Sequence, residues 1–171
     1  MIRYTTFSTP LGKMFLAASS RGICRLDFVV PGRNFKSWFA RHYPDQPVQA
    51  DGRTLGSTVK TLQDYFRGKH QRLDLPLDLR GTDFERRVWQ ALRKIPRGKT
   101  TTYGRVASQI HRPRAARAVG RAVGLNPIAV VVPCHRVIGS DGSLTGYASG
   151  LGRKARLLAL EGAVAKQNLP A

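Results

Sequence analysis

Residues 126–147 of this chain read Asn-Pro-Ile-Ala-Val-Val-Val-Pro-Cys-His-Arg-Val-Ile-Gly-Ser-Asp-Gly-Ser-Leu-Thr-Gly-Tyr, and at their centre stands one of only two cysteines. Cys134 follows an apolar run and is itself followed by His135 and Arg136. A thiol is a nucleophile only as the thiolate, with an ordinary pKa of about 8.5, which a neighbouring imidazole or guanidinium lowers. For a Cys-His pair alone a buried structural thiol is the commoner interpretation, and the sequence that flanks Cys134 decides between it and a reactive cysteine.

The net charge of +19 is the strongest feature of the composition. Residues 81–171 carry sixteen basic and four acidic side chains, and no acidic residue occurs between Glu85 and Asp141. Such a field concentrates polyanions and speeds their encounter with the protein, so nucleic acid is the expected partner. An anionic membrane surface is the alternative, but no segment combines a basic face with a bulky apolar one.

The length of 171 residues suits one domain or two small ones. No stretch approaches the roughly 18 apolar residues of a membrane helix, and the N-terminus lacks an apolar signal core. Cys24 and Cys134 are too few and too far apart to suggest a disulfide framework or a zinc quartet. We therefore expect no metal and a reducing, cytoplasmic setting.

The first half of the chain predicts a small α/β domain over residues 1–79. Short runs rich in aromatic and β-branched residues, separated by turn signals, predict two antiparallel hairpins over residues 2–7, 13–19 and 22–29. Residues 34–42 and 55–66 predict helices, the second ended by Gly68. Residues 73–79 alternate with period two around a central proline, which favours an edge strand or an extended linker.

Residues 80–171 predict a second, mainly helical domain. Thr82 begins a segment with capping-box spacing, and apolar residues at helical intervals follow it. Thr102 can cap a second helix through Ile110, and Pro113 suits the first turn of a third, which gives a helix-turn-helix. In that third helix five residues predict an inward apolar face: Ala115, Ala118, Val119, Ala122 and Val123. A last helix is expected over residues 153–160. The predicted fold class is α+β.

The stretch quoted above resembles the active-site signature of the O6-alkylguanine-DNA alkyltransferases, which take an alkyl group from guanine O6 onto their own cysteine. The resemblance is specific over residues 82–162 and looser before them. It implies a ribonuclease-H-like first domain and a winged-helix-like second domain. It also implies direct-reversal DNA repair, in which an alkyl group from O6-alkylguanine in duplex DNA moves irreversibly to Cys134. Whether O4-alkylthymine is also a substrate stays open.

Ala-Ala-Arg-Ala-Val-Gly at residues 115–120 resembles the family motif whose helix enters the minor groove. The resemblance implies that Arg117 fills the base stack when the target nucleotide flips out, with Ala115 and Ala116 beside it. A stacked guanine cannot present O6 to a protein thiol, so the base must leave the helix. Arg114 and Arg121 share the basic face; a solvated stripe is the alternative interpretation.

Further site residues follow from the resemblance alone. Tyr103, otherwise more typical of a packing tyrosine, is expected to hydrogen-bond the flipped guanine and protonate N3, which neutralises the leaving group. Glu161, otherwise typical of a solvated charge, is expected to orient His135, which activates Cys134 through a water.

The substrate pocket is also implied by resemblance. Asn126 is expected to hold the turn before the active site, and the Val137 carbonyl to read the guanine amino group. Tyr147 and Ala148 resemble the loop that closes over the extruded base. The family usually has two glycines where this chain has Ser149-Gly150, which bears on the shape of the alkyl pocket.

The alkylated base is itself the donor, so no cofactor is expected. A thioether sulfur is a poor leaving group, so each molecule is expected to act once. We expect a monomer in solution, and cooperative assembly on DNA stays open. Two rivals remain: a non-catalytic alkyl-lesion sensor, whose relatives lack the cysteine, and a thiol hydrolase, which would need a separate oxyanion hole.

Overall fold

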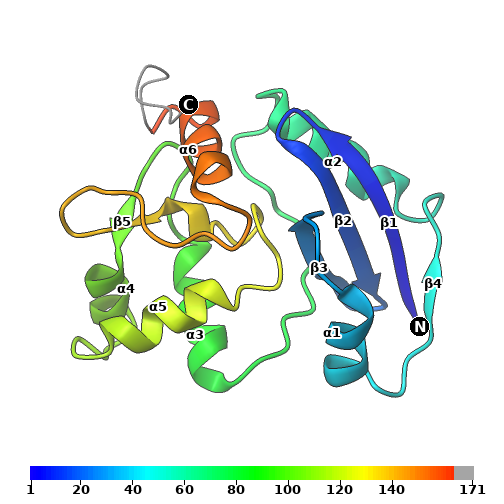
Figure 1. Ribbon diagram of the computed structural model, residues 1–171, viewed down its shortest axis with the longest axis horizontal. Coiled ribbons are helices and arrows are strands. Elements are labelled where there is room, and N and C mark those ends of the chain that lie inside the picture. Colours follow the sequence, from blue (N-terminus) through cyan, green and yellow to red (C-terminus); the bar gives the residue numbers. More distant parts are fainter. Residues whose placement is uncertain (164–171) are drawn as a thin grey trace. The chain divides into compact units, whose positions relative to one another are not determined.

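The computed structural model describes residues 1–163 and divides into two compact units, Met1–Arg80 and a second beginning at Gly81. Each unit has its own secondary structure and core, and each is described by itself (Figure 1). The predicted α+β class is confirmed, with a sheet-based first unit and a mainly helical second unit.

The first unit is built on a four-stranded mixed sheet of order β3-β2-β1-β4. The predicted hairpins are confirmed as β1 (Ile2–Thr9), β2 (Gly12–Ser19) and β3 (Gly22–Phe28), paired antiparallel. The sequence did not reveal β4 (Val48–Ala50), which pairs parallel to β1. Its three residues are all exposed, so no hydrophobic alternation marks it as a strand.

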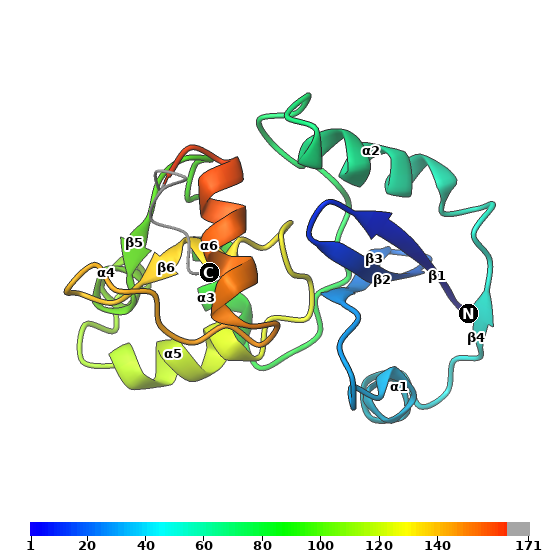
Figure 2. The ribbon, with the colours of Figure 1, turned by 45° about the horizontal axis from the view of Figure 1, so that its top comes forward.

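Both faces of this sheet are covered. Helices α1 (Phe35–His42) and α2 (Gly56–Phe66), both predicted, lie on opposite sides of it (Figure 2). Four successive β2 residues, 14–17, are therefore buried instead of alternating with exposed ones. On the α1 side the core cluster is aromatic. Its buried members are Ile2, Phe15, Ala17, Cys24, Phe39 and Tyr43.

The period-two segment at residues 73–79 forms no regular strand. It runs extended and makes a single bridge, Leu77 to Ile23, flanked by a hydrogen bond from the Ile23 amide to the Pro76 carbonyl at 2.9 Å. Pro76 itself has no amide to donate to a ladder. The approach is close, since a Cβ at Gly22 would lie 2.3 Å from the Pro76 carbonyl oxygen. Of the two alternatives, a regular edge strand is therefore not formed, and the segment makes only this bridge to β3.

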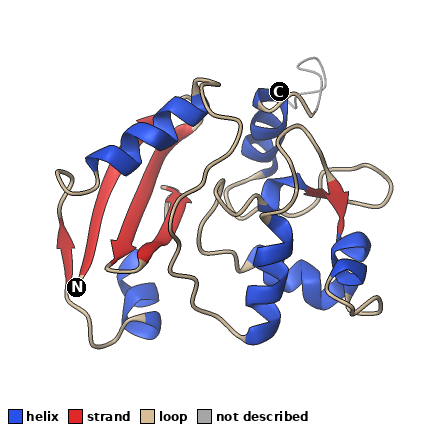
Figure 3. Cartoon of the chain, turned by 180° about the vertical axis from the view of Figure 1, so that it is seen from behind, coloured by secondary structure: helices blue, strands red, loops and turns tan. Residues whose placement is uncertain are grey.

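Over residues 81–163 the second unit has four α-helices and a two-stranded sheet (Figure 3). The helices are α3 (Asp83–Leu92), α4 (Tyr103–Gln109), α5 (Ala116–Gly124) and α6 (Leu151–Leu160). The predicted capping box of α3 is present, and the Thr102 side chain caps α4. The Trp89 indole donates to the Ala122 carbonyl at 2.8 Å and so ties α3 to α5.

Two details of the third predicted helix are wrong. It begins at Ala116 and not near Pro113, because His111 has a φ of 59° and residues 112–115 then close a turn through the Ala115 amide and Arg112 carbonyl. Ala118 is exposed, whereas Val119 and the apolar residues that follow it on the same face are buried. The shorter helix has a narrower buried stripe than the sequence suggested.

Candidate active site

Cys134 is positioned by a turn that side-chain hydrogen bonds from Asn126 hold in place. It opens the 3-10 helix η1 (Cys134–Arg136), directly after a buried apolar segment, and is 8% exposed. The Asn126 side chain closes this segment from both ends: its amide donates to the Val132 carbonyl at 2.8 Å, and its carbonyl oxygen accepts from the Ile128 amide at 3.0 Å. Inside it, Val130 has a φ of 72°, a strained conformation for a β-branched residue.

The Glu161 carboxylate interacts with both residues that follow Cys134, namely His135 and Arg136. His135 Nε2 lies 2.8 Å from Glu161 Oε1. Arg136 donates two hydrogen bonds to the same carboxylate, from Nε to Oε2 at 2.8 Å and from Nη2 to Oε1 at 2.9 Å. Its third nitrogen, Nη1, donates to the Ile95 carbonyl oxygen. All three side chains are buried. A two-point ion pair of this kind fixes both the position and the plane of the carboxylate.

The protonation states of this cluster follow from its surroundings. Burial disfavours the charged imidazole and lowers the pKa of His135 below its ordinary value, although Glu161 opposes the shift. Burial alone would raise the pKa of Glu161, but hydrogen bonds from His135 and Arg136 outweigh it and lower that pKa. At neutral pH the cluster is therefore a neutral imidazole held by an ionised carboxylate.

Tyr103 is brought close to the strand that follows the cysteine turn. Strand β5 (Thr101–Thr102) pairs parallel with β6 (Val137–Ile138), which places the start of α4 beside the residues that follow η1. The Tyr103 hydroxyl lies 3.3 Å from the Thr145 carbonyl oxygen and 3.2 Å from its hydroxyl. Strand pairing thus brings Tyr103 together with the loop that precedes Tyr147.

The loop of residues 143–150 carries the remaining pocket residues. Tyr147 is half-buried, Ala148 is exposed and Ser149 is buried. The Gly150 amide donates to the Tyr147 carbonyl at 2.9 Å, and Gly150 has a φ of 100°. This glycine turns the chain into α6, which carries Glu161 at its C-terminal end.

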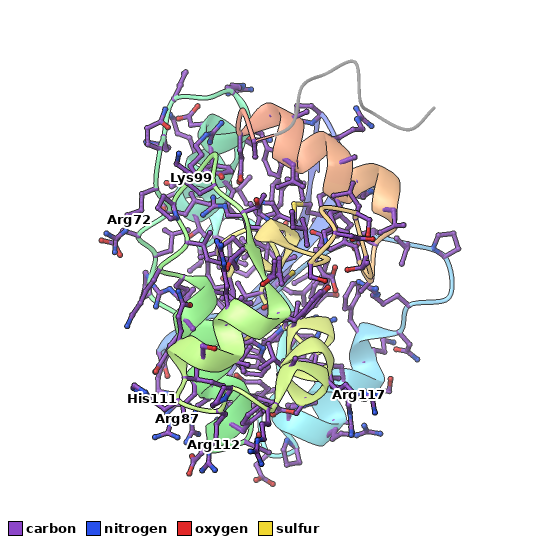
Figure 4. The ribbon with its side chains drawn as sticks, turned by 90° about the vertical axis from the view of Figure 1, so that its left-hand side faces the viewer. Arg72, Arg87, Lys99, His111, Arg112 and Arg117 are labelled. Atoms are coloured by element: carbon purple, nitrogen blue, oxygen red, sulfur yellow. The ribbon has the colours of Figure 1, made fainter. Side chains whose placement is uncertain are left out.

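Exposed arginines lie on α5 and in the turn that precedes it. Arg114, Arg117 and Arg121 are exposed, whereas Ala115 and Ala116 are half-buried. Figure 4 shows Arg117 on α5, with Arg87, His111 and Arg112 near one another at the same end of this unit. A Cβ at Gly120 would lie 3.7 Å from the Tyr103 ring, so the tyrosine packs against α5. The basic helix and the cysteine turn are thereby parts of one packed unit.

Two residues of this region escaped the sequence interpretation. Arg136 stood in the motif only as a neighbour expected to acidify the thiol, whereas it anchors Glu161. Lys154 is completely buried and donates to backbone carbonyls. One signal could have found it: Lys154 lies three and four positions before the buried residues Leu157 and Leu158, so it occupies the inward face of α6.

Within residues 1–163, no three His, Cys, Asp or Glu side chains are grouped so that they could hold a metal ion. No helix in that part of the chain is long and apolar enough to cross a membrane. Neither Cys24 nor Cys134 forms a disulfide bond.

Fold and site together define a class: a two-unit α+β protein whose basic helical unit carries a cysteine beside a buried histidine–glutamate pair. The family models match both units. Residues 2–79 match the ribonuclease-like domain of 6-O-methylguanine DNA methyltransferase, and residues 83–163 match its DNA binding domain. This chain belongs to the 6-O-methylguanine DNA methyltransferase family.

Individual relatives agree. The methylated-DNA–protein-cysteine methyltransferase of Mycolicibacterium paratuberculosis is 47% identical over 165 residues, which cover 94% of this chain and 93% of the relative. The solved structure of Mycobacterium tuberculosis O6-methylguanine methyltransferase aligns with a TM-score of 0.84 at 43% identity, covering 99% of this chain and 98% of that one. That of Mycobacterium tuberculosis OGT in complex with DNA aligns with a TM-score of 0.82 at 43% identity, covering 94% and 93%.

Proposed function

We propose that this protein repairs O6-alkylguanine in duplex DNA by moving the alkyl group to its own Cys134. The observation that carries the proposal is the buried His135–Glu161 pair directly beside the cysteine, on a unit that presents a basic helix. Membership of the methyltransferase family supports the same reaction. In it the Cys134 sulfur forms a bond to the alkyl carbon, the bond from that carbon to O6 breaks, and its electron pair stays on the guanine.

We assign His135 the role of base. Its Nε2 faces an ionised carboxylate and therefore holds the proton, which leaves Nδ1 as the acceptor. Nδ1 is buried and makes no hydrogen bond within residues 1–163. Buried polar atoms are normally satisfied by protein or by ordered water, so a water between Nδ1 and the Cys134 sulfur would carry the thiol proton to the imidazole.

Tyr103 is the proposed proton donor to the departing guanine. The departing guanine gains negative charge as the bond to its O6 breaks, and a phenol proton delivered to N3 neutralises that charge. The Tyr103 hydroxyl already lies within hydrogen-bonding distance of Thr145 in the loop proposed to cover the base. The Val137 carbonyl and the 147–148 segment would complete the pocket, and the reaction itself requires no cofactor.

For the DNA partner, we propose that α5 enters the minor groove and that Arg117 occupies the gap left by the flipped nucleotide. Arg117 and Arg121 are exposed on a helix with small residues, and Arg114 is exposed in the turn before it, which supports close approach to a duplex. Alkyl transfer requires Cys134 in its reduced form, which the reducing cytoplasm would maintain. We also propose that the protein is a monomer in solution.

Duplex DNA carrying a labelled O6-methyl group tests the proposal. Incubation should move the label to protein and leave guanine in the DNA. A lesion sensor would bind this DNA but leave the label on it, and a hydrolase would release the label as a small molecule. Either of these two distributions would contradict the transferase.

Replacing Arg117 with alanine should slow repair of duplex DNA by about 10–100-fold, because unstacking a base requires a few kcal/mol that the inserted side chain helps to offset. Transfer from free O6-methylguanine, which needs no flipping, should stay within about twofold of wild type. Arg121→Ala removes the same charge from the same exposed face and serves as the control. Single-turnover rates on both substrates measure the difference. Equal losses on the two substrates would rule out a flipping role.

A further inference from the structure

Arg97 is a half-buried cation that the reaction described above does not use. It stands in a turn of residues 95–98, which lies between α3 and β5. The Arg97 Nη2 donates to the Leu160 carbonyl oxygen at 3.1 Å. Leu160 is the last residue of α6 and directly precedes Glu161. The turn therefore contacts the helix end that carries the carboxylate of the site.

The C-terminal end of α6 needs such a partner. The last carbonyls of a helix have no donor within it and must be satisfied from elsewhere. Gly162, with a φ of 77°, reverses the chain, so that the amides of Gly162 and Ala163 donate to two earlier carbonyls of α6. The Leu160 carbonyl takes no part in this cap and instead accepts from Arg97. A guanidinium is also a favourable charge at this end of a helix.

The 95–98 turn meets the same cluster at two further points. Its Ile95 carbonyl accepts from Nη1 of Arg136, whose other two nitrogens donate to the Glu161 carboxylate. Gly98 has a φ of 78°, and a Cβ placed on it would lie 3.0 Å from the Glu161 carbonyl oxygen. The turn thus lies against the backbone of Glu161 and also holds the arginine that pairs with its side chain.

We propose that Arg97 is a positioning residue for alkyl transfer: its guanidinium holds the end of α6 against the 95–98 turn and so keeps the Glu161 carboxylate within hydrogen-bonding distance of His135. That carboxylate fixes the tautomer in which Nδ1 of His135 can accept a proton. A displaced carboxylate would leave a weaker base and a Cys134 thiol that ionises less readily. The inference rests on the transfer activity proposed above, and it assigns Arg97 no contact with the substrate base.

The charges around the cysteine turn stay in the chain when Arg97 is replaced. The charged side chains that face His135 come from η1 and from the C-terminal part of α6 with its cap: Arg136, Lys154 and Glu161. Of these, Lys154 also acts on Cys134. An altered pH dependence of thiol reactivity in an Arg97 variant would therefore reflect a change in where these groups lie.

Replacing Arg97 with methionine tests the proposal, because methionine keeps an apolar stem and has no hydrogen to donate. Single-turnover transfer from methylated duplex and from free O6-methylguanine should fall by the same factor, about tenfold, which corresponds to one pKa unit in the thiol. Lys99→Met removes an exposed cation from the same loop and should transfer as wild type (Figure 4). The two variants should bind undamaged duplex within about twofold of each other. Arg97→Lys keeps a donor and the charge, and should recover most of the lost rate.

Iodoacetamide reports on the thiol without any DNA. This small reagent alkylates the ionised form of Cys134, so the pH dependence of its rate gives the pKa of that thiol, and a Cys24→Ala background leaves one thiol to read. In Arg97→Met the midpoint should move up by about one pH unit, with the high-pH plateau unchanged. Slower transfer with an unmoved midpoint would overturn the positioning role, and so would wild-type transfer by Arg97→Met.

A double substitution shows whether Arg97 acts through Glu161. Glu161→Gln already removes the carboxylate, so adding Arg97→Met to it should slow transfer by less than about twofold. A further tenfold loss, about as large as in the wild-type background, would place the effect of Arg97 elsewhere and overturn the proposal. If Arg97→Met does not fold, Arg97→Gln keeps a shorter, neutral donor and should show part of both shifts; an unmoved rate and midpoint would again overturn it.

The two proposals fail in different ways. A wild-type protein that reacts with iodoacetamide but never accepts label from methylated DNA would refute the transfer activity itself, whatever Arg97→Met does to the midpoint.

Discussion

Replacing Cys134 with serine should abolish alkyl transfer, with a loss on the order of 10⁴-fold or more, comparable to removing the nucleophile of other covalent catalysts. A serine hydroxyl is almost entirely protonated at neutral pH, and the neutral His135 beside it is too weak a base to change that. The substitution keeps the size and burial of the side chain, so the fold should survive. Binding to methylated duplex should be nearly unchanged, because affinity comes mostly from phosphate contacts. Label transfer and a binding titration on the same DNA measure the two effects.

Cys24→Ala is the matched control for the other thiol. Cys24 lies fully buried in the first unit, and burial, with Asp78 nearby, raises its pKa to about 12, so it is not expected to react. This variant should accept a full equivalent of label. Label that persists in Cys134→Ser, or that disappears in Cys24→Ala, would mean that the acceptor has been misassigned.

Replacing Glu161 with alanine should be the most destabilising single change near the site. It would leave the Arg136 guanidinium buried without its carboxylate and His135 without its partner. Breaking one side of a buried ion pair costs about 3–5 kcal/mol, which corresponds to a melting temperature about 6–20 °C lower for a chain of this size. Asp83→Ala removes a carboxylate that is 90% exposed, and its ion pair with Arg86 should contribute less than about 1 kcal/mol. A melting temperature for Glu161→Ala equal to that of Asp83→Ala would contradict the geometry.

The same pair makes stability depend on pH. The pKa of Glu161 is lower in the folded protein than in the unfolded chain, so its stabilisation is present above about pH 4.3 and is lost as acid protonates the unfolded carboxylate. The pKa of His135 is also lowered by folding, so the unfolded imidazole takes up a proton first, near pH 6.5. Both effects weaken the fold as pH falls. Denaturant unfolding of wild type between pH 8 and about pH 2 should show this decline, and Glu161→Ala should lack the carboxylate's share of it, which is lost below about pH 4.3.

The features that the sequence predicted well are local ones. The capping box at Thr82 and the Pro-Cys-His motif each involve only adjacent or nearly adjacent residues. The structure shows α3 capped as predicted. It shows a tight turn at Cys134. Strand β4 was missed because its exposed residues carry no periodic signal. The start of α5 was misplaced because Pro113 suits a first helical turn, while the positive φ of His111 leads the chain into a separate turn.

The site itself depends on pairings that spacing does not encode. Glu161 lies 26 positions from His135, and only the family resemblance pointed to it. The partnership of Arg136 with Glu161 and that of Lys154 with three carbonyls require the folded chain, because each joins the residues around Cys134 to α6 or to the loop before it. In sequence Arg136 and Lys154 are two among 29 basic side chains, most of which are exposed in the described residues.

The measurement that tests the account most directly is a titration of the protein with duplex DNA carrying one O6-methylguanine per duplex, read by intact-protein and peptide mass spectrometry. A thioether sulfur is a poor leaving group, so the bond formed between Cys134 and the methyl group is not expected to break again. Repair should therefore stop at one equivalent, with one methyl group gained by the protein and located on Cys134. Repair beyond one equivalent, or a methyl group on any other residue, would contradict the account.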